Sequence, residues 1–454
     1  MICVENSIII HSELLFFLRK GGIQVKKIKY IMLVLLFIFM LSVCFCAEGA
    51  EYKDEVSVGI KFGTNAGTSL TVSSTDGINV IDYLTGAVLY TSQPSEAISV
   101  EMGSTGFASW NKFDASGISK ISFCPANGGI IVCDGVEYRG YILAERMSNG
   151  ELLVINYVGI DEYVSSVLGK EMSYTWPKEA LKAQAVCARN FVLTRGSTHK
   201  TYGFDVCTTT HCQVYGGVKS EHPNTRQAVE ETSGVVAKYN GKLVGLYFFA
   251  TSGGATENVE NVWGSKYGYL RSVEDTYENP EKASRYNWTV TLSKSQIEEK
   301  LINAGASIGS LNKITIDSVS DTGRVLEMTF HGSQGTYSVK REKSRTILSL
   351  YSQKFTIRGE GDVSIVTTSG QAGSSLYALS ANGTSAVASY TAIGKNGELC
   401  RINTDTYGSE NYIITGGGYG HGVGMSQWGA RGMAENGFTY DQILHHYFTD
   451  IELE

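Results

Sequence analysis

Alternating apolar and polar positions dominate the chain from residue 55 to residue 160. The segments VSVGIKFG, INVIDYL, GIIVCDG and LLVINYVG all show this pattern, and a period of two is typical of half-buried β-strands. Asn-Gly pairs recur along the chain, and such pairs favour the tight turns of antiparallel hairpins. We therefore expect residues 51–160 to form a β-rich leading region.

The pattern changes to a helical period at residue 161. In the segment DEYVSSVLGKEM, four apolar residues fall on one helical face and Asp161 stands where a helix cap is expected. Pro177 can begin a second, alanine-rich helix that continues to about Arg195, because proline is well tolerated in a first helical turn. The sequence thus predicts two consecutive helices after the strands.

The remaining pattern is mixed and predicts an α+β fold that is β-rich with a few helices. We expect the helix pair to pack on antiparallel strands and to carry the chemistry. The expected segments are a core over 161–358 with a hairpin at Asn240-Gly241 and a helix near 293–304, a Ser/Gly-rich insertion over 359–410, and a last core segment over 411–454 that is glycine-rich and then helical from about 425 to 447. The insertion is either a small β element or a mobile loop.

A predicted export signal precedes the strands. Residues 30–46 form one apolar run behind three lysines, a pattern typical of a signal peptide or a single membrane anchor. We expect this element to occupy residues 25–50 and the body to act outside the cytoplasm, in the cell envelope. Residues 1–24 fit no targeting pattern, which suggests an over-extended start with initiation near Val25.

Composition narrows the class of partner. The 454 residues are 43% hydrophobic and 18% charged, with a net charge of −7, which argues against nucleic acid as a partner because phosphate binding needs a basic face. An exported chain can form disulfides, and Cys124 and Cys133 flank a turn where they could pair. Cys187 stands among alanines, as expected for a buried filler.

Glu171 is the candidate acid. It falls in the last turn of the first predicted helix, where the partial negative charge of the helix end raises the pKa of a carboxyl group. A glutamate that stays protonated can act as a general acid. Lys182 and Arg189 share a face of the next helix and could hold an anionic substrate. The alternative is a solvated cationic face beside a surface glutamate.

A polar loop concentrates metal-binding side chains. His199, Cys207, His211 and Cys212 lie within 14 residues, and two thiolates with two imidazoles form a typical tetrahedral zinc set. Four protein ligands would leave no position for water, so such a zinc ion, one per chain, would be structural. A Cys207–Cys212 disulfide or free thiols are the alternatives.

Two glycine-rich stretches could bind a sugar polymer. GGGYGHGVGMSQWGARGM contains His421 and Gln427, and TSGGATENV contains Ser252. Their side chains offer hydrogen bonds, and glycine lets backbone approach a ligand closely. The first stretch lacks the Gly-Lys-Ser/Thr of a phosphate-binding loop. Each could instead be a tight structural turn.

Together these stretches resemble the stage II sporulation protein D (SpoIID/LytB) family. The resemblance rests on DEYVSSVLGKEM, WPKEALKAQAVCARNF, CTTTHCQVYGG, TSGGATENVENVW and GHGVGMSQWGARGMAENGFTYDQILHHYF, which follow one another in family order. It implies a lytic transglycosylase that cleaves peptidoglycan glycan strands, preferably those stripped of stem peptides, during engulfment in sporulation. It also implies that Glu171 is the catalytic acid and that the Cys/His loop binds zinc.

Such an enzyme can act with one carboxylate, whereas ordinary glycoside hydrolysis uses two. Glu171 would protonate the glycosidic oxygen and then accept the proton of the sugar's own 6-hydroxyl, giving a 1,6-anhydromuramic end. Two alternatives stay open. One is a hydrolase that uses Glu257 as a second acid. The other is a non-catalytic wall-binding protein that enhances an N-acetylmuramoyl-L-alanine amidase, a partner that the resemblance also suggests.

Overall fold

The computed structural model describes residues 54–454, apart from 104–105, 110–111, 196–197 and parts of 360–408. The two predicted N-terminal segments, the extended start and the signal or anchor, lie outside the described residues. In the part that is described, none of the helices combines the length and the apolar character needed to cross a membrane.

Two largely antiparallel sheets build the leading region, as the alternating pattern predicts, and one short strand, β12, joins the first sheet in the parallel direction. Their buried faces share one hydrophobic core, which includes Val58 and Val154 from the first sheet and Leu70 and Ile131 from the second. The first sheet has the order β12 (Val206–Cys207), β1 (Glu55–Lys61), β11 (Leu152–Gly159), β10 (Tyr141–Arg146), β7 (Lys120–Pro125), β3 (Ile78–Asp82) and β4 (Val88–Thr91). The second has the order β6 (Phe107–Ser109), β5 (Ile98–Met102), β2 (Ser69–Ser73), β8 (Ile131–Cys133) and β9 (Val136–Tyr138).

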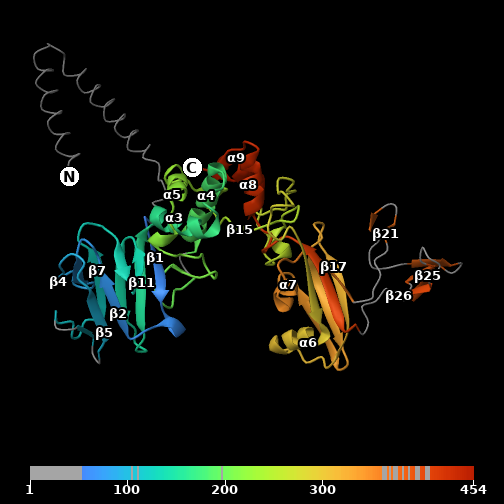
Figure 1. Ribbon diagram of the computed structural model, residues 1–454, viewed down its shortest axis with the longest axis horizontal. Helices are drawn as coiled ribbons and strands as arrows, with labels where there is room; N and C mark the ends of the chain where they lie inside the picture. Colours follow the sequence, from blue (N-terminus) through green and yellow to red (C-terminus); the bar gives the residue numbers. More distant parts are fainter. Residues whose placement is uncertain are drawn as a thin grey trace, which may run out of the picture. The chain divides into compact units, whose positions relative to one another are not determined.

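The predicted helix pair is confirmed, and its second member is the centre of a helical cluster (Figure 1). The cluster contains α3 (Ile160–Glu171), α4 (Lys178–Thr194), α5 (Pro223–Glu230), α8 (Gln427–Glu435) and α9 (Tyr440–Tyr447). Helix α4 contacts each of the other four. Residues Ala180 to Val192 are almost all buried, as expected for a helix surrounded by other elements. Cys187 is among them, fully buried as predicted.

The C-terminal helix predicted over 425–447 is instead two helices. Helix α8 ends at Glu435, and Gly437 adopts a φ of +86°, a conformation that suits glycine and breaks a helix. Thr439 and Gln442 then form a capping box that begins α9. The Asn-Gly pair at this point carried the signal for the break.

A second, smaller core lies within residues 288–414, and both cores belong to one unit, Asp54–Glu454. Its strands form two sheets, β16 (Asn287–Ser293), β27 (Asn411–Gly417) and β20 (Phe355–Gly359), and β17 (Leu311–Val319), β18 (Val325–Gly332) and β19 (Gly335–Lys340). The helices are α6 (Lys294–Asn303) and α7 (Lys343–Leu348). Ser293 and Gln296 cap α6 reciprocally, so the helix predicted near 293–304 is confirmed.

Short strands complete the described part. The predicted turn at Asn240-Gly241 joins β13 (Ala237–Tyr239) to β14 (Lys242–Leu243), and β29 (Glu452–Leu453) pairs with β13. β15 (Phe248–Phe249) pairs with β28 (Met425–Ser426). Within the predicted insertion the described strands form hairpin pairs, β21 (Val366–Thr367) with β22 (Gly370–Gln371), β23 (Tyr377–Ser380) with β24 (Gly383–Ala386), and β25 (Ser389–Ile393) with β26 (Leu399–Asn403). The predicted α+β class is confirmed.

Candidate functional site

Glu171 is the last residue of α3, as the helical pattern predicts. Burial raises the pKa of its carboxyl group, and a hydrogen bond with the Gln427 side chain opposes that rise. The sequence predicted the direction of this shift from the helix dipole, whereas the structure gives burial as the main cause. A half-buried acid of this kind keeps its proton to higher pH than an exposed glutamate.

Two amide side chains from distant segments meet at this acid. Gln427, the first residue of α8, donates from Nε2 to the backbone oxygen of Glu171 at 3.3 Å. The same Nε2 lies 3.5 Å from Oε1 of Gln184, which is fully buried in α4. The sequence analysis selected Gln427 but missed Gln184. A glutamine among the alanines of an otherwise apolar stretch was the available signal, because a buried polar residue usually has a specific partner.

An aromatic pair links the segment after α3 to the start of α8. The rings of Trp176, which lies between α3 and α4, and Trp428, which follows Gln427, have centroids 4.9 Å apart. The guanidinium of Arg431 lies 5.2 Å and 4.8 Å from the two ring centroids and pairs with Glu435. Flat indole rings are suited to holding a sugar ring, because they offer apolar faces together with a polar edge.

The predicted cationic face on α4 is not free for a ligand. Arg189 is 2% exposed, and its Nη2 pairs with Asp161 at 2.7 Å. Lys182 pairs with Glu179 at 3.0 Å and with Glu231 at 3.3 Å. Spacing correctly placed both cations on one side of the helix, but that side faces protein groups. The alternative of a solvated face is also wrong for Arg189, which is a buried structural residue.

Replacing Arg189 with methionine should therefore lower stability. We expect a loss of about 2–3 kcal/mol in the free energy of unfolding, because charged hydrogen bonds to Asp161 disappear. Urea unfolding measures this loss. Lys178→Met is the matched control, since the Lys178 side chain on the same helix is 46% exposed and should change stability by less than about 1 kcal/mol. Equal stability of the Arg189→Met variant and the parent would contradict the structural role.

The Cys/His loop is attached to the first sheet. Its strand β12 runs parallel to β1, with Cys207 opposite Gly59. A side chain at Gly59 would clash with the ring of Phe204, since a Cβ would lie 2.4 Å from it. The ring of His199 stacks on the same Phe204 ring at 4.6 Å. Packing on the sheet thus fixes the start of the loop.

The structure brings the four predicted ligands together. The donor atoms of His199, Cys207, His211 and Cys212 all lie within 4.8 Å of one another. Nε2 of His199 is 3.4 Å from Sγ of Cys212, and Nδ1 of His211 is 3.5 Å from that sulfur and 3.9 Å from Sγ of Cys207. Ligand edges of a tetrahedral zinc site are roughly 3.3–3.8 Å, given its usual bond lengths, so the donor set fits such an ion. Both cysteines are free thiols in the structure, and so are Cys124 and Cys133.

Ser252 lies inside the protein and not on a binding surface. It is fully buried, its backbone nitrogen donates to Glu278, and its carbonyl accepts from Arg324. Burial and the nearby Asp275 raise the pKa of Glu278 to about 7, and burial raises the pKa of Asp275 to about 6. The TSGGATENV turn is thus anchored to buried acids, which matches the structural alternative.

Glu257 and His421, two further residues singled out in the sequence, lie in the same part of the protein as Ser252. Glu257 is 1% exposed, and its carboxylate accepts from Asn258 and Asn261 on one oxygen and from Ser320 and Thr322 on the other. His421 accepts from the Val423 nitrogen at 3.1 Å and packs near the rings of Phe249 and Trp263. Burial lowers the pKa of His421 to about 4, so this imidazole is neutral at physiological pH.

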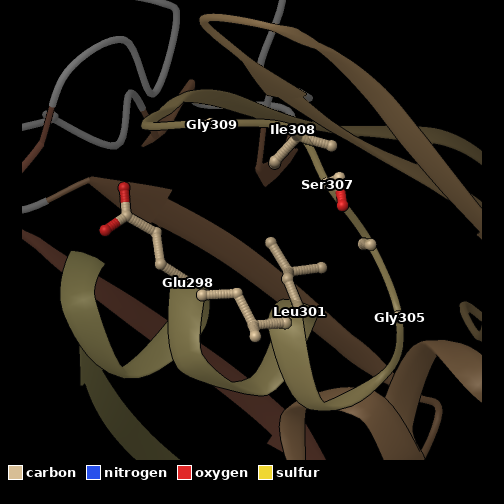
Figure 2. Close-up of a pocket in the computed structure, with 8 residues that line it drawn as sticks. Glu298, Leu301, Gly305, Ser307, Ile308 and Gly309 are labelled. Atoms are coloured by element: carbon tan, nitrogen blue, oxygen red, sulfur yellow. The ribbon is translucent and has the colours of Figure 1, made fainter.

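A pocket of about 210 Å³ lies beside α6, away from every predicted site residue (Figure 2). It is lined by the last turns of α6 and the segment that follows them, including Glu298, Leu301 and Ile308. Glu298 already accepts hydrogen bonds from Leu311 and Ser310. The pocket therefore adds no group to the candidate chemistry.

Two family profiles match the chain. One, described as stage II sporulation protein (SpoIID), covers residues 148–239, and the other, a domain of unknown function, covers residues 269–379. The first includes Glu171 and all four Cys/His ligands. Gln427, the amide partner of the acid, lies outside both matched ranges.

Three relatives extend the similarity. An uncharacterized protein of Brachyspira hyodysenteriae is 31% identical over 70% of this chain and 73% of its own length. The amidase enhancer of Bacillus subtilis is 32% identical over 63% of this chain and 39% of its own length. Stage II sporulation protein D of the same organism is 27% identical over 66% of this chain and 75% of its own length. This chain therefore belongs to the stage II sporulation protein D family.

Proposed function

We propose that this chain is a peptidoglycan lytic transglycosylase that acts on glycan strands, preferably strands stripped of stem peptides. The observation that carries the proposal is the position of Glu171, a half-buried acid with a raised pKa at the end of α3. The second carboxylate that hydrolysis would need is not at hand in Glu257, because both of its oxygens are buried and hydrogen-bonded. A single acid supports a reaction that consumes no water.

Glu171 would perform both proton transfers. It first donates its proton to the glycosidic oxygen, which lets the bond to the anomeric carbon break. The resulting carboxylate then accepts the proton of the 6-hydroxyl of the same muramic sugar as that oxygen attacks the anomeric carbon. The glycosidic bond is replaced by an internal acetal linkage from the anomeric carbon to the 6-oxygen, the departing sugar keeps the first proton on its freed hydroxyl, and the acid regains its proton from the 6-hydroxyl. Gln427 orients the acid, and Trp176 and Trp428 hold a sugar ring beside it.

The metal would support this site without taking part in the reaction. His199, Cys207, His211 and Cys212 would hold one zinc ion, which supplies a closed structural link between the loop and β1. The proposed reaction does not need the zinc ion, because Glu171 performs both proton transfers. The zinc ion is thus proposed as a folding element.

The family and the relatives support a role at the cell wall during sporulation. Glycan strands would be the partner, with an amidase as a second protein acting on the same wall. Such a role places the body of the protein outside the cytoplasm, which agrees with the apolar segment at residues 30–46.

The products of cleavage test the proposal. Purified protein incubated with denuded glycan strands should release fragments that end in 1,6-anhydromuramic acid. Mass spectrometry distinguishes these fragments from hydrolytic products, which carry one more water per cut. Products with ordinary reducing ends would exclude the transglycosylase and favour a hydrolase.

A non-catalytic enhancer of an amidase is the second candidate. The 32% identity to the amidase enhancer of Bacillus subtilis favours it. This role predicts that the pure protein binds the wall without cutting it and that it accelerates stem-peptide removal by an added amidase. Cleavage of denuded strands with no amidase present would exclude a purely non-catalytic role.

A further inference from the structure

A second pocket, of about 290 Å³, lies on the outer side of the first sheet and is assigned to no step above. We name it the tyrosine pocket, after Tyr83, Tyr157 and Tyr202. Its charged lining residues are Lys120, Glu145 and Lys200. Its volume is close to the lower end of the range for small-molecule sites, about 300–1,000 Å³.

One wall is the sheet itself. Ile155 and Tyr157 are two positions apart on β11 and therefore project to the same side of the sheet. Leu143 of β10 stands opposite Ile155. On the next pair of strands Glu145 stands opposite Lys120, and their charged groups lie 2.9 Å apart. Leu143 and Ile155 are buried, whereas the outer side of an antiparallel sheet usually carries polar residues. Here it carries aromatic rings around one ion pair.

The tyrosines form a small network. The rings of Tyr141 and Tyr157 stand opposite each other and stack at 4.9 Å with an interplanar angle of 2°. Burial and the neighbouring Tyr83 hydroxyl raise the pKa of Tyr157. Tyr83 is nevertheless 43% exposed, so its ring offers a face and an edge to a ligand.

The second wall is the start of the Cys/His loop. Residues 200–203, directly after His199, line the pocket on this side. Tyr202 is held by Phe62 and Phe204, with ring centroids 5.3 Å and 5.9 Å away. Lys200 is exposed and forms no ion pair with any described residue. The pocket therefore combines fixed aromatic rings with a cation that is free for an anionic ligand.

This combination suits an acidic sugar. Tyrosine rings provide apolar surface for the carbon face of a sugar, and their hydroxyls both donate and accept hydrogen bonds. A purely apolar ligand would displace water from the Lys120–Glu145 ion pair and offer it no hydrogen bonds in return, so the pocket disfavours such a ligand. A sugar carboxylate would instead pair with Lys200, and its hydroxyls would satisfy the rest.

We propose that the tyrosine pocket is a second saccharide-binding site, which holds one part of an anionic glycan strand while another part occupies the site at Glu171. The class of ligand rests on the proposed function. Tyr157 is three residues before α3, and Glu171 ends that helix, whose 12 residues span about 18 Å. One strand bound at both places is retained more strongly than at either alone, because the second contact is intramolecular.

Binding to long strands tests the inference. The double variant Tyr83→Ala, Lys200→Gln removes two exposed side chains, so the fold should survive. We expect its apparent Kd for denuded strands in a sedimentation assay to rise about tenfold or more, well within the gain that two linked contacts provide. Leu84→Ala is the matched control, since Leu84 adjoins Tyr83, is 67% exposed and does not line the pocket.

Three further outcomes define the ligand. Lys200→Gln alone should reduce the salt dependence of binding to denuded strands and leave binding to carboxylate-free chitin oligosaccharides unchanged. Tyr83→Ala alone should weaken both. Cleavage of the shortest oligosaccharide that the protein accepts should proceed at the parent rate in the double variant, because that substrate uses only the site at Glu171.

The inference and the proposed function fail separately. If the double variant and the Leu84→Ala control bind long strands as tightly as the parent, the tyrosine pocket is no glycan site, whatever the cleavage products are. If the protein cuts no glycan, the binding comparison still decides the role of the pocket.

Discussion

We expect replacement of Glu171 with glutamine to lower the rate of the proposed glycan cleavage by about 10²–10⁴-fold and to leave strand binding intact. Glutamine keeps the size of the side chain but has no acidic proton, and general acid–base catalysis is typically worth that factor. Cleavage of denuded strands, measured by the release of anhydromuramic ends, checks the rate, and sedimentation checks the binding. Glu162→Gln is the matched control, because Glu162 is an exposed acid on the same helix.

The pH dependence of the parent follows from the same carboxyl group. Burial raises the pKa of Glu171, and the acid must be protonated to act. The cleavage rate should therefore fall as pH rises through that raised pKa. The free energy of unfolding should also fall as pH rises through this range. The folded state disfavours the ionised form of Glu171, so the protein loses stability as that carboxyl group ionises. At pH 8 the Glu171→Gln variant should thus be at least as stable as the parent. Cleavage by the Glu171→Gln variant at the parent rate would show that Glu171 has no part in the mechanism.

Removing the proposed zinc ion should destabilise the protein. We expect one zinc ion per chain, and a loss of several kcal/mol in the free energy of unfolding when a chelator removes it. This is less than the apparent ~10–16 kcal/mol of zinc binding in small zinc-finger peptides, because the loop is also held by β12 and by packing on Phe204. Metal analysis and thermal unfolding before and after chelation measure both quantities.

A cysteine variant separates the metal from general effects of the thiols. Cys212→Ser should lose the zinc and show most of the loss in stability. Cys124→Ser should retain both, because Cys124 lies in β7 outside the Cys/His cluster. A protein without stoichiometric metal, or one with a Cys207–Cys212 disulfide in non-reducing mass mapping, would contradict the zinc site.

Local pattern was sufficient to predict the elements that carry the chemistry. The helical spacing of four apolar residues predicted the end of the first helix to within one residue of Glu171. Pro177 marked the position just before α4. The Cys/His spacing within one loop identified four side chains that meet in the structure. These features depend on neighbours in sequence, so a reading of the sequence alone can find them.

The environment of each residue could not be predicted in the same way. Helical spacing shows that Lys182 and Arg189 share a side, but it does not show that Asp161 and Glu231 lie there. Nor can a turn motif reveal that Ser252 is buried against Glu278. Burial is set by elements that arrive from elsewhere in the chain.

The contact between Glu171 and Gln427 spans 256 positions in the chain. During synthesis α3 appears long before α8, whereas domains generally fold as units. Until residues 427–435 have docked on α4, the acid lacks its amide partner and the second indole. If the chain is exported and cleaves glycan as proposed, a chain still crossing the membrane would have an incomplete site, and cleavage would begin only after the whole body has been delivered and folded.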